Sequence, residues 1–340
     1  MPPPDVSAAA TAMTLAEAAT LMDRLQRELR KVIVGQDAVV TEILVAFLAG
    51  GHCLLRGVPG LAKTLIIKTL ADAVHLRFSR IQFTPDLMPS DILGTEVIEE
   101  DRTSGARVIR FLPGPIFANI ILADEINRTP PKTQAALLEA MQEYQVTIGG
   151  KRYALDRPLF VLATQNPIEQ EGTYPLPEAQ LDRFMLNVVI GYPTAAEERA
   201  ILSQTTTGEE RTASPVADGA SIERARLLVR EVVAADNVVD YAARLVRATR
   251  PVSAGESPDF VRQWVRWGAG PRAGQALLLA GKARAVMHGR PAVSLEDVRA
   301  AAAPVLRHRV LVNFEAEADG IDAEAIVGRL LDAIPPTLRA

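Results

Sequence analysis

Short apolar runs alternate with amphipathic segments over the first half of the chain. Three runs, 53–56, 119–123 and 159–164, are almost continuously apolar, which is typical of strands buried on both faces of a parallel sheet. Segments such as 14–31 and 65–74 repeat apolar residues with the period of a helix. The pattern predicts an α/β fold, with a parallel sheet flanked by helices.

The remaining elements of this half follow from local signals. Asp37 is expected to cap a helix over 38–48, and 78–84 is expected to be a further strand. A helix is expected to open at Asp124 and to run to Tyr144. Two hairpins are also expected. The segments 96–99 and 108–111 flank turn residues at 101–105, and 145–148 and 151–155 flank a Gly-Gly turn.

After Tyr192-Pro193 the pattern is almost purely helical. Helices are expected over 195–203, 221–234, 241–249, 258–267, 271–288 and 295–306. The sequence therefore predicts a Pro/Ala-rich, disordered tail over 1–12, an α/β core with a leading helix over 13–193, a linker over 194–220 and an all-α domain over 221–340.

A phosphate-binding loop lies between the first apolar run and the following helix. It reads Gly57-Val58-Pro59-Gly60-Leu61-Ala62-Lys63-Thr64. Backbone N–H groups of such a loop converge on phosphate oxygens at the positive end of the helix dipole. Lys63 would neutralise the β- and γ-phosphates, and Thr64 would ligate Mg²⁺. An ordinary Gly/Pro turn is the alternative, but the Lys-Thr pair in register favours the phosphate loop.

One position departs from the common loop pattern. Ala62 stands where the last glycine is usual, and alanine is expected to fit there only with a negative φ.

Polar residues end the other two apolar runs. Asp124 and Glu125 follow the second run, and Asn166 follows the third. Asp124 is placed to hold Mg²⁺ through water, Glu125 to polarise the attacking water, and Asn166 to contact that water or the γ-phosphate. Alone, an acidic pair can be a helix start and Asn-Pro can be a turn. Together they predict a site at the carboxyl edge of the sheet.

These motifs resemble the MoxR family of AAA+ ATPases, from about Val32 to the end of the chain. The resemblance rests on the loop, on Ala-Asp-Glu-Ile-Asn-Arg at 123–128, on Ala-Thr-Gln-Asn-Pro at 163–167 and on Leu-Asp-Arg-Phe at 181–184. The family pattern carries Ala at the position of Ala62. The resemblance also implies that the all-α domain is a AAA+ lid and that the two hairpins are inserts typical of this AAA+ branch.

The resemblance also implies roles for residues outside these strands. Val34-Gly35-Gln36 would border the adenine, Asn166 would be the sensor-1 residue, and Arg183 would be an arginine finger that reaches the ATP of a neighbouring subunit. A local Asp182–Arg183 ion pair is the alternative for Arg183. Arg272, after Gly270-Pro271, would be the sensor-2 residue, acting on its own or on a neighbouring nucleotide, and a solvated helix start is the alternative.

The family implies an ATP-driven, chaperone-like machine that matures or activates partner complexes. A homo-oligomeric ring, expected to be a hexamer, is implied, and partners with von Willebrand factor A domains and metal-cofactor insertion are recurring themes. A nucleic-acid motor and a magnesium-chelatase motor subunit are the alternatives. A net charge of −4 and the lack of an appended DNA-binding domain disfavour the first, and the loop sequence disfavours the second.

Length and composition limit the class of protein and its compartment. The 340 residues suffice for two domains, and 48% hydrophobic with 23% charged residues is typical of globular proteins. No apolar run reaches membrane-spanning length, the start lacks a signal-peptide pattern, and the single Cys53 suits a reducing compartment. Cytoplasmic residence without membrane insertion is expected. Four dispersed histidines predict no zinc site, and Trp264 and Trp267 are expected on one helical face.

Overall fold

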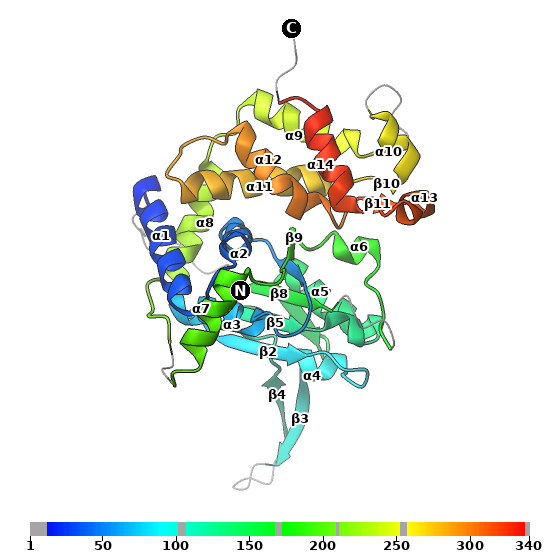
Figure 1. Ribbon diagram of the computed structural model, residues 1–340. Helices are drawn as coiled ribbons and strands as arrows, with labels where there is room; N and C mark the ends of the chain where they lie inside the picture. Colours follow the sequence, from blue (N-terminus) through cyan, green and yellow to red (C-terminus); the bar gives the residue numbers. More distant parts are fainter. Residues whose placement is uncertain (1–11, 101–106, 167–171, 209–210, 252–256, 337–340) are drawn as a thin grey trace.

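The computed structural model describes residues 12–100, 107–166, 172–208, 211–251 and 257–336. Within these ranges, a half built around one parallel sheet is followed by a half made almost entirely of helices (Figure 1). The predicted α/β core and helical C-terminal part are both confirmed. No helix in the described ranges combines the length and apolar character needed to cross a bilayer.

The central sheet has five parallel strands in the spatial order β2-β5-β8-β1-β9. Its strands are β1 (Cys53–Arg56), β2 (Phe78–Gln82), β5 (Ile120–Asp124), β8 (Phe160–Gln165) and β9 (Leu186–Val189). The register pairs Arg56 with Gln165 and Gln82 with Asp124. The carboxyl ends of these strands therefore finish at nearly the same level, and residues that follow them meet at one edge.

The strands are buried on both faces, which explains their continuous apolar runs. Leu55 and Leu122 point into the apolar cluster on one face. Leu54 and Ile121 point into the cluster on the opposite face. The first cluster is filled by α1 (Leu15–Val32), α2 (Asp37–Ala49) and α3 (Lys63–Ala73), and the second by α5 (Pro131–Glu143).

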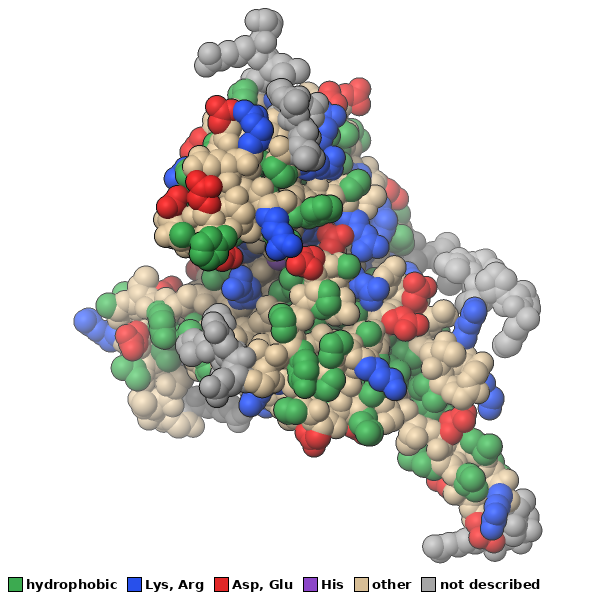
Figure 2. All heavy atoms as spheres, turned by 90° about the vertical axis from the view of Figure 1, so that its right-hand side faces the viewer, with side chains coloured by type: hydrophobic (Ala, Val, Ile, Leu, Met, Phe, Trp, Pro, Cys, Tyr) green, Lys and Arg blue, Asp and Glu red, His purple; other side chains and the backbone are tan. Residues whose placement is uncertain are grey.

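Both predicted hairpins are confirmed. They are β3 (Gly94–Glu100) with β4 (Arg107–Pro113), which follow the short α4 (Pro89–Leu93), and β6 (Gln145–Ile148) with β7 (Lys151–Ala154). The β3/β4 hairpin projects from the body of the molecule (Figures 1 and 2). The predicted turn at 101–105 lies outside the described residues.

The helical half packs on the core through its longest helix. Its helices are α7 (Ala195–Thr205), α8 (Gly219–Glu231), α9 (Asp236–Ala248), α10 (Asp259–Trp264), α11 (Pro271–Met287), α12 (Leu295–Leu306), α13 (Phe314–Ala318) and α14 (Ala323–Ala333). Helix α11 contacts α8, α9 and α12 within this half, and α1 and α2 of the core. One apolar cluster therefore runs through both halves. The short α6 (Glu178–Leu181) precedes β9.

Three local expectations are wrong. The helix expected from Asp124 is a 3₁₀ turn, Ile126–Arg128, and α5 starts only at Pro131, because the residue before a proline avoids the helical region. Asp37 lies inside α2, whose N-cap is Gln36 in a left-handed conformation. Trp267 belongs to β10 (Val265–Trp267), paired with β11 (Leu311–Val312), rather than to the helix of Trp264.

Candidate nucleotide site

The phosphate loop joins β1 to α3, which begins at Lys63. The backbone is left-handed at Gly60, with φ 85°, and at Ala62, with φ 56°. The negative φ expected for Ala62 is therefore wrong. A left-handed residue beside right-handed ones turns successive N–H groups toward one concave side, which forms an anion-binding nest. For alanine this conformation costs about 1–2 kcal/mol, and such strain is common at binding loops.

The side chain of Lys63 folds back toward the start of this loop. Its Nζ donates a hydrogen bond to the carbonyl of Gly57 at 2.8 Å. The ammonium group is therefore held at the start of the loop, and Thr64 follows in the first turn of α3. Both side chains stand at the N-terminus of a helix, where the dipole and the exposed N–H groups favour phosphate.

A cavity of about 520 Å³ opens beside the loop. Its size is typical of small-molecule sites. Its lining comes from the end of α1 and the following loop (Val32, Ile33, Val34, Gln36), from the phosphate loop and α3 (Gly60, Leu61, Ala62, Leu65), from Pro193, and from α7 and the loop after it (Ile201, Gln204, Thr205, Gly208, Arg211). The lining is mostly apolar, which suits the faces of a purine base.

The structure brings Val34 and Gln36 into this lining, with Gly35 between them. Sequence reasoning missed the contribution of α7, because nothing in its pattern distinguishes Ile201 or Gln204 from any other helical surface residue. Arg211 donates to Oε1 of Gln204 at 3.0 Å. This contact adds a polar pair to one side of the cavity.

The acidic pair stands at the end of β5 and is held by neighbouring strands. Thr164 on β8 donates its hydroxyl to Oδ1 of Asp124 at 2.6 Å and accepts the backbone N–H of Glu125 at 2.9 Å. Arg80 on β2 pairs with Oδ2 of Asp124 at 2.6 Å. One buried hydroxyl thus fixes both acidic residues relative to β8.

Glu125 is itself left-handed, with φ 58°. Its carboxylate accepts hydrogen bonds from Nε2 of Gln82 at 3.0 Å and from Nη1 of Arg128 at 2.9 Å. The sequence indicated Glu125 but not these partners. Arg80 and Gln82 alternate along a predicted strand, and only the pairing of β2 with β5 shows that they face the acidic pair.

Asn166 directly follows β8 and is 5% exposed. Since β8 lies between β5 and β1, Asn166 stands at the sheet edge between the acidic pair and the phosphate loop. The carbonyl of the preceding Gln165 accepts the N–H of Gly57 at 3.5 Å. The predicted series of three strand ends is therefore found at one edge.

The donors available at this edge fit Mg²⁺. Thr64 offers a hydroxyl and Asp124 a carboxylate, and Mg²⁺ is usually held by one or two carboxylates together with substrate phosphates and water. Among the described residues, no group of three or more His, Cys, Asp or Glu side chains could hold a metal by itself. The chain thus offers a few oxygen ligands, of the kind that a nucleotide-bound Mg²⁺ requires.

The two predicted arginines lie elsewhere. Residue Arg183 precedes β9 by three residues, and β9 pairs with β1 in parallel, Leu186 opposite Cys53. Arg183 therefore stands at the amino edge of the sheet, opposite the edge where Gly57 starts the phosphate loop. Neither Arg183 nor Arg272 lines the cavity beside that loop.

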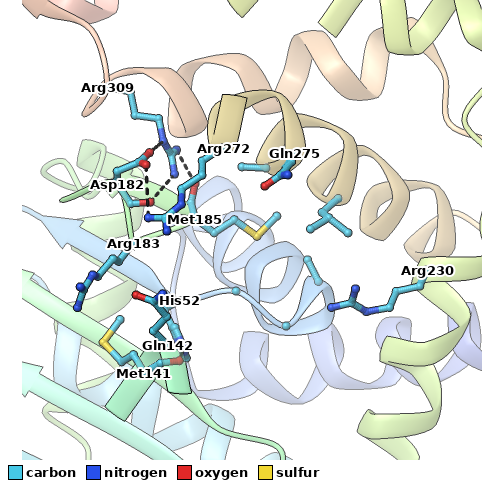
Figure 3. A pocket seen from close by; sticks show the side chains of 15 residues that line it. His52, Met141, Gln142, Asp182, Arg183, Met185, Arg230, Arg272, Gln275 and Arg309 are labelled. Carbon is cyan, nitrogen blue, oxygen red and sulfur yellow. Dashed lines mark hydrogen bonds and ion pairs between the residues drawn. The ribbon is translucent and has the colours of Figure 1, made fainter. Parts of the chain in front are cut away.

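Arg183 and Arg272 instead share a second cavity, of about 300 Å³, between the core and the helical half (Figure 3). Asp182 accepts a hydrogen bond from Nε of Arg309 at 2.7 Å, and Nη1 of Arg272 lies 3.7 Å from its other oxygen. The alternative Asp182–Arg183 pair is therefore not formed. The Arg183 side chain is directed away from Asp182 (Figure 3), and it has no ion-pair partner in the part of the chain that the structure describes.

Comparisons with known proteins identify the family of the chain. Residues 52–186 match the model of the ATPase family associated with various cellular activities (AAA), and 260–330 match an AAA lid domain. Chaperone MoxR1 of Mycobacterium tuberculosis is 43% identical over 319 residues, which is 92% of this chain and 81% of that protein. Protein MoxR of Paracoccus denitrificans is 33% identical, covering 91% of this chain and 93% of its own length.

Solved structures give the same result. A crystal structure from Cytophaga hutchinsonii, of a protein assigned as an ATPase, superposes with a TM-score of 0.86 at 40% identity. The match covers 95% of this chain and 97% of that one.

Proposed function

This chain belongs to the MoxR family of AAA+ ATPases, and we propose that it hydrolyses ATP with Mg²⁺ to mature or activate partner protein complexes. The proposal includes a homo-oligomeric ring, a hexamer, in which each nucleotide lies between two subunits. It also includes a partner protein with a von Willebrand factor A domain, on the strength of the family resemblance.

The residues at the carboxyl edge have separable roles in this proposal. Lys63 binds the β- and γ-phosphates, and Thr64 and Asp124 hold the Mg²⁺ ion, which neutralises phosphate charge when bound. Glu125 orients the attacking water and Asn166 contacts it or the γ-phosphate. Phosphoryl transfer depends chiefly on positioning and charge stabilisation. The Thr164 hydroxyl, which donates to Asp124 and accepts the N–H of Glu125, supports this division of roles because it holds both residues in place.

One observation carries the proposal of a shared site. The phosphate loop stands at the carboxyl edge of the sheet, whereas Arg183 and Arg272 stand at the amino edge beside a different cavity. An arginine that stabilises the transferred phosphate must reach it directly. Within one chain these arginines lie at the edge of the sheet opposite the phosphate loop, which supports their supply by a second copy. We propose that Arg272, like Arg183, acts in trans on the nucleotide of a neighbouring subunit.

The β3/β4 hairpin supports action on proteins. Ile98, Val108 and Ile109 are 69%, 54% and 62% exposed on a hairpin that projects from the core. Ile98 and Ile109 are direct cross-strand partners, so they form one apolar patch on one face of the hairpin. Such a patch, remote from the nucleotide site, suits contact with a client protein better than contact with nucleic acid.

Paired substitutions test the ATPase assignment. Lys63→Ala should abolish ATP binding, because it removes the charge that faces the phosphates. Glu125→Gln should bind ATP normally but stop turnover, because the amide cannot polarise water. Binding of a fluorescent ATP analogue and phosphate release would be measured for both. If Glu125→Gln hydrolyses ATP at the rate of the unmodified protein, the role assigned to that carboxylate is wrong.

A further inference from the structure

Arg309 lies in the helical half, in the turn after α12 and before β11. It is 7% exposed although it carries a charge. A buried guanidinium is stable only when its donors are satisfied. All of its N–H groups have acceptors, and most of those acceptors belong to a single short segment of the core.

Four of the five hydrogen bonds of Arg309 go to residues 182–185. Its Nε donates to the carboxylate of Asp182 at 2.7 Å and its Nη2 to the Asp182 carbonyl at 3.2 Å. Nη2 also donates to the carbonyl of Phe184 at 2.7 Å, and Nη1 donates to the carbonyl of Met185 at 3.1 Å. The fifth hydrogen bond goes to Val305 on its own side of the interface, at 2.5 Å.

These acceptors belong to the residues that precede and follow Arg183 in the sequence. The carbonyls of Asp182, Phe184 and Met185 belong to a segment between α6 and β9 that has no regular secondary structure to satisfy them. Arg309 supplies the missing donors. The ring of His308 adds a contact between its Nε2 and the carbonyl of Phe184 at 3.0 Å. The backbone that carries Arg183 is therefore held by side chains of the helical half, while the Arg183 side chain itself is directed away from them (Figure 3).

We propose that Arg309 is a positioning residue, which fixes the backbone around Arg183 so that Arg183 can reach the nucleotide of a neighbouring subunit. The inference rests on the proposed role of Arg183. The new element is that the orientation of Arg183 depends on the helical half of the same chain, because the guanidinium of Arg309 holds the backbone on both sides of it. A lysine cannot reproduce it, because its ammonium lacks the planar set of five donors.

The chain offers a matched control. Arg226 on α8 is 9% exposed and also links the helical half to the core, donating from Nε to the carbonyl of Phe47 on α2 at 2.9 Å. It has no hydrogen bond to residues 182–185 among those recorded for the described chain. Burial lowers the pKa of both arginines, so each substitution perturbs a buried cation at the contact between the two halves. Arg226 differs in that its Nη2 has no hydrogen-bond partner among the described residues.

Steady-state ATP hydrolysis by the 340-residue chain tests the proposal. Arg309→Lys should lower kcat about tenfold or more with the KM for ATP unchanged, whereas Arg226→Lys should change kcat by less than about twofold, since small misplacements of a catalytic group cost large factors in rate. Arg309→Met should lower kcat further. Thermal unfolding of all variants shows whether the two lysine substitutions perturb the fold equally.

Mixed subunits locate the defect. Arg309→Lys protein mixed with Lys63→Ala protein should regain turnover, because the first supplies an intact nucleotide site and the second an intact Arg183. Arg309→Lys mixed with Arg183→Ala should regain none. Unchanged kcat in Arg309→Lys, an equal loss in Arg226→Lys, or an effect on KM alone would overturn the inference. If Arg183→Ala itself hydrolyses ATP normally, the role proposed for Arg183 fails instead, whereas the ATPase assignment still depends on Lys63→Ala and Glu125→Gln.

Discussion

At the scale of single residues, the nucleotide site depends on side chains that carry no recognisable motif. Thr164 is fully buried, and its hydroxyl is hydrogen-bonded to both Asp124 and Glu125. A carboxylate that accepts such a bond loses a charge-assisted contact when the hydroxyl is removed. Thr164 therefore links the orientation of Asp124, the proposed metal ligand, to that of Glu125, the residue proposed to polarise water.

Thr164→Val should separate this role from packing. The substitution keeps the shape of the side chain but removes the hydroxyl, so we expect ATP turnover to fall at least about tenfold while the free energy of unfolding falls by about 1–3 kcal/mol. Turnover and chemical denaturation would be measured on the same preparation.

Thr249 provides the control for this substitution. It is also fully buried, donates to the carbonyl of Val246 at 2.6 Å and accepts the N–H of Ala269 at 2.8 Å. Thr249→Val should cost a similar amount of stability but leave turnover unchanged. Equal losses of turnover in the two variants would show that Thr164 acts only through stability.

Sequence reasoning reached some of these residues and not others, for a physical reason. Asp124 and Asn166 follow strand-like runs closely, and Lys63 ends the glycine-containing loop after another such run, so their place at one edge follows from a parallel sheet. Thr164 and Gln82 contact the acidic pair from the strands on either side of β5. The local pattern of apolar and polar residues does not reveal which strands are neighbours in the sheet. The left-handed conformation of Ala62 was missed because alanine alone gives no signal for it.

At the scale of elements, α2 carries a titratable group into the contact between the two halves. Glu42 on α2 packs against α11 and α12, beside Ala280 and Ala301. Burial raises the pKa of Glu42 from 4.5 to about 7. The charge of Arg307 opposes this shift, and that of Glu324 reinforces it. The folded protein therefore holds a proton on Glu42 at pH values where the unfolded chain has lost it.

This raised pKa predicts a defined pH window. The contribution of the neutral carboxyl to stability is complete below pH 4.5 and is lost as pH rises through about 7. Glu42→Gln mimics the protonated form at every pH. We expect the variant to match the unmodified protein near pH 4.5 and to exceed its unfolding free energy by about 1–3 kcal/mol above pH 7.

Denaturant titrations across this pH range would measure the difference between the two proteins. Burial lowers the pKa of His52 to about 4, which weakens the fold on acidification, but this effect is common to both proteins and cancels. A difference that is constant with pH would contradict the assignment to Glu42.

The elements show where local pattern suffices and where it does not. Both hairpins were predicted because turn residues mark them. The helix over 295–306 was predicted from its periodicity, and the structure shows that it begins at a Ser294–Asp297 capping box. The helix expected from Asp124 was wrong because Thr129 before Pro130-Pro131 adopts an extended backbone. Trp267 was misplaced because a three-residue strand is too short to show alternation.

At the scale of the whole molecule, the proposed shared site has two half-sites on opposite edges of one sheet. The carboxyl edge carries Lys63 and the acidic pair, and the amino edge carries Arg183, held by Arg309 from the helical half. The two half-sites could not be separated from sequence, because their distance depends on the direction of β9 relative to β1. A heterologous contact between copies, repeated around a closed ring, would bring one edge of each copy to the opposite edge of the next.

The most direct test of this shared site is the ATP turnover of two inactive proteins after mixing. Arg183→Ala has an intact nucleotide site and Lys63→Ala an intact arginine, so we expect each to be inactive alone. In an equal mixture that exchanges subunits at random, about a quarter of the contacts should be active. Turnover should therefore rise to about a quarter of that of the unmodified protein. A mixture that stays inactive despite forming mixed rings, or full turnover by Arg183→Ala alone, would contradict the account.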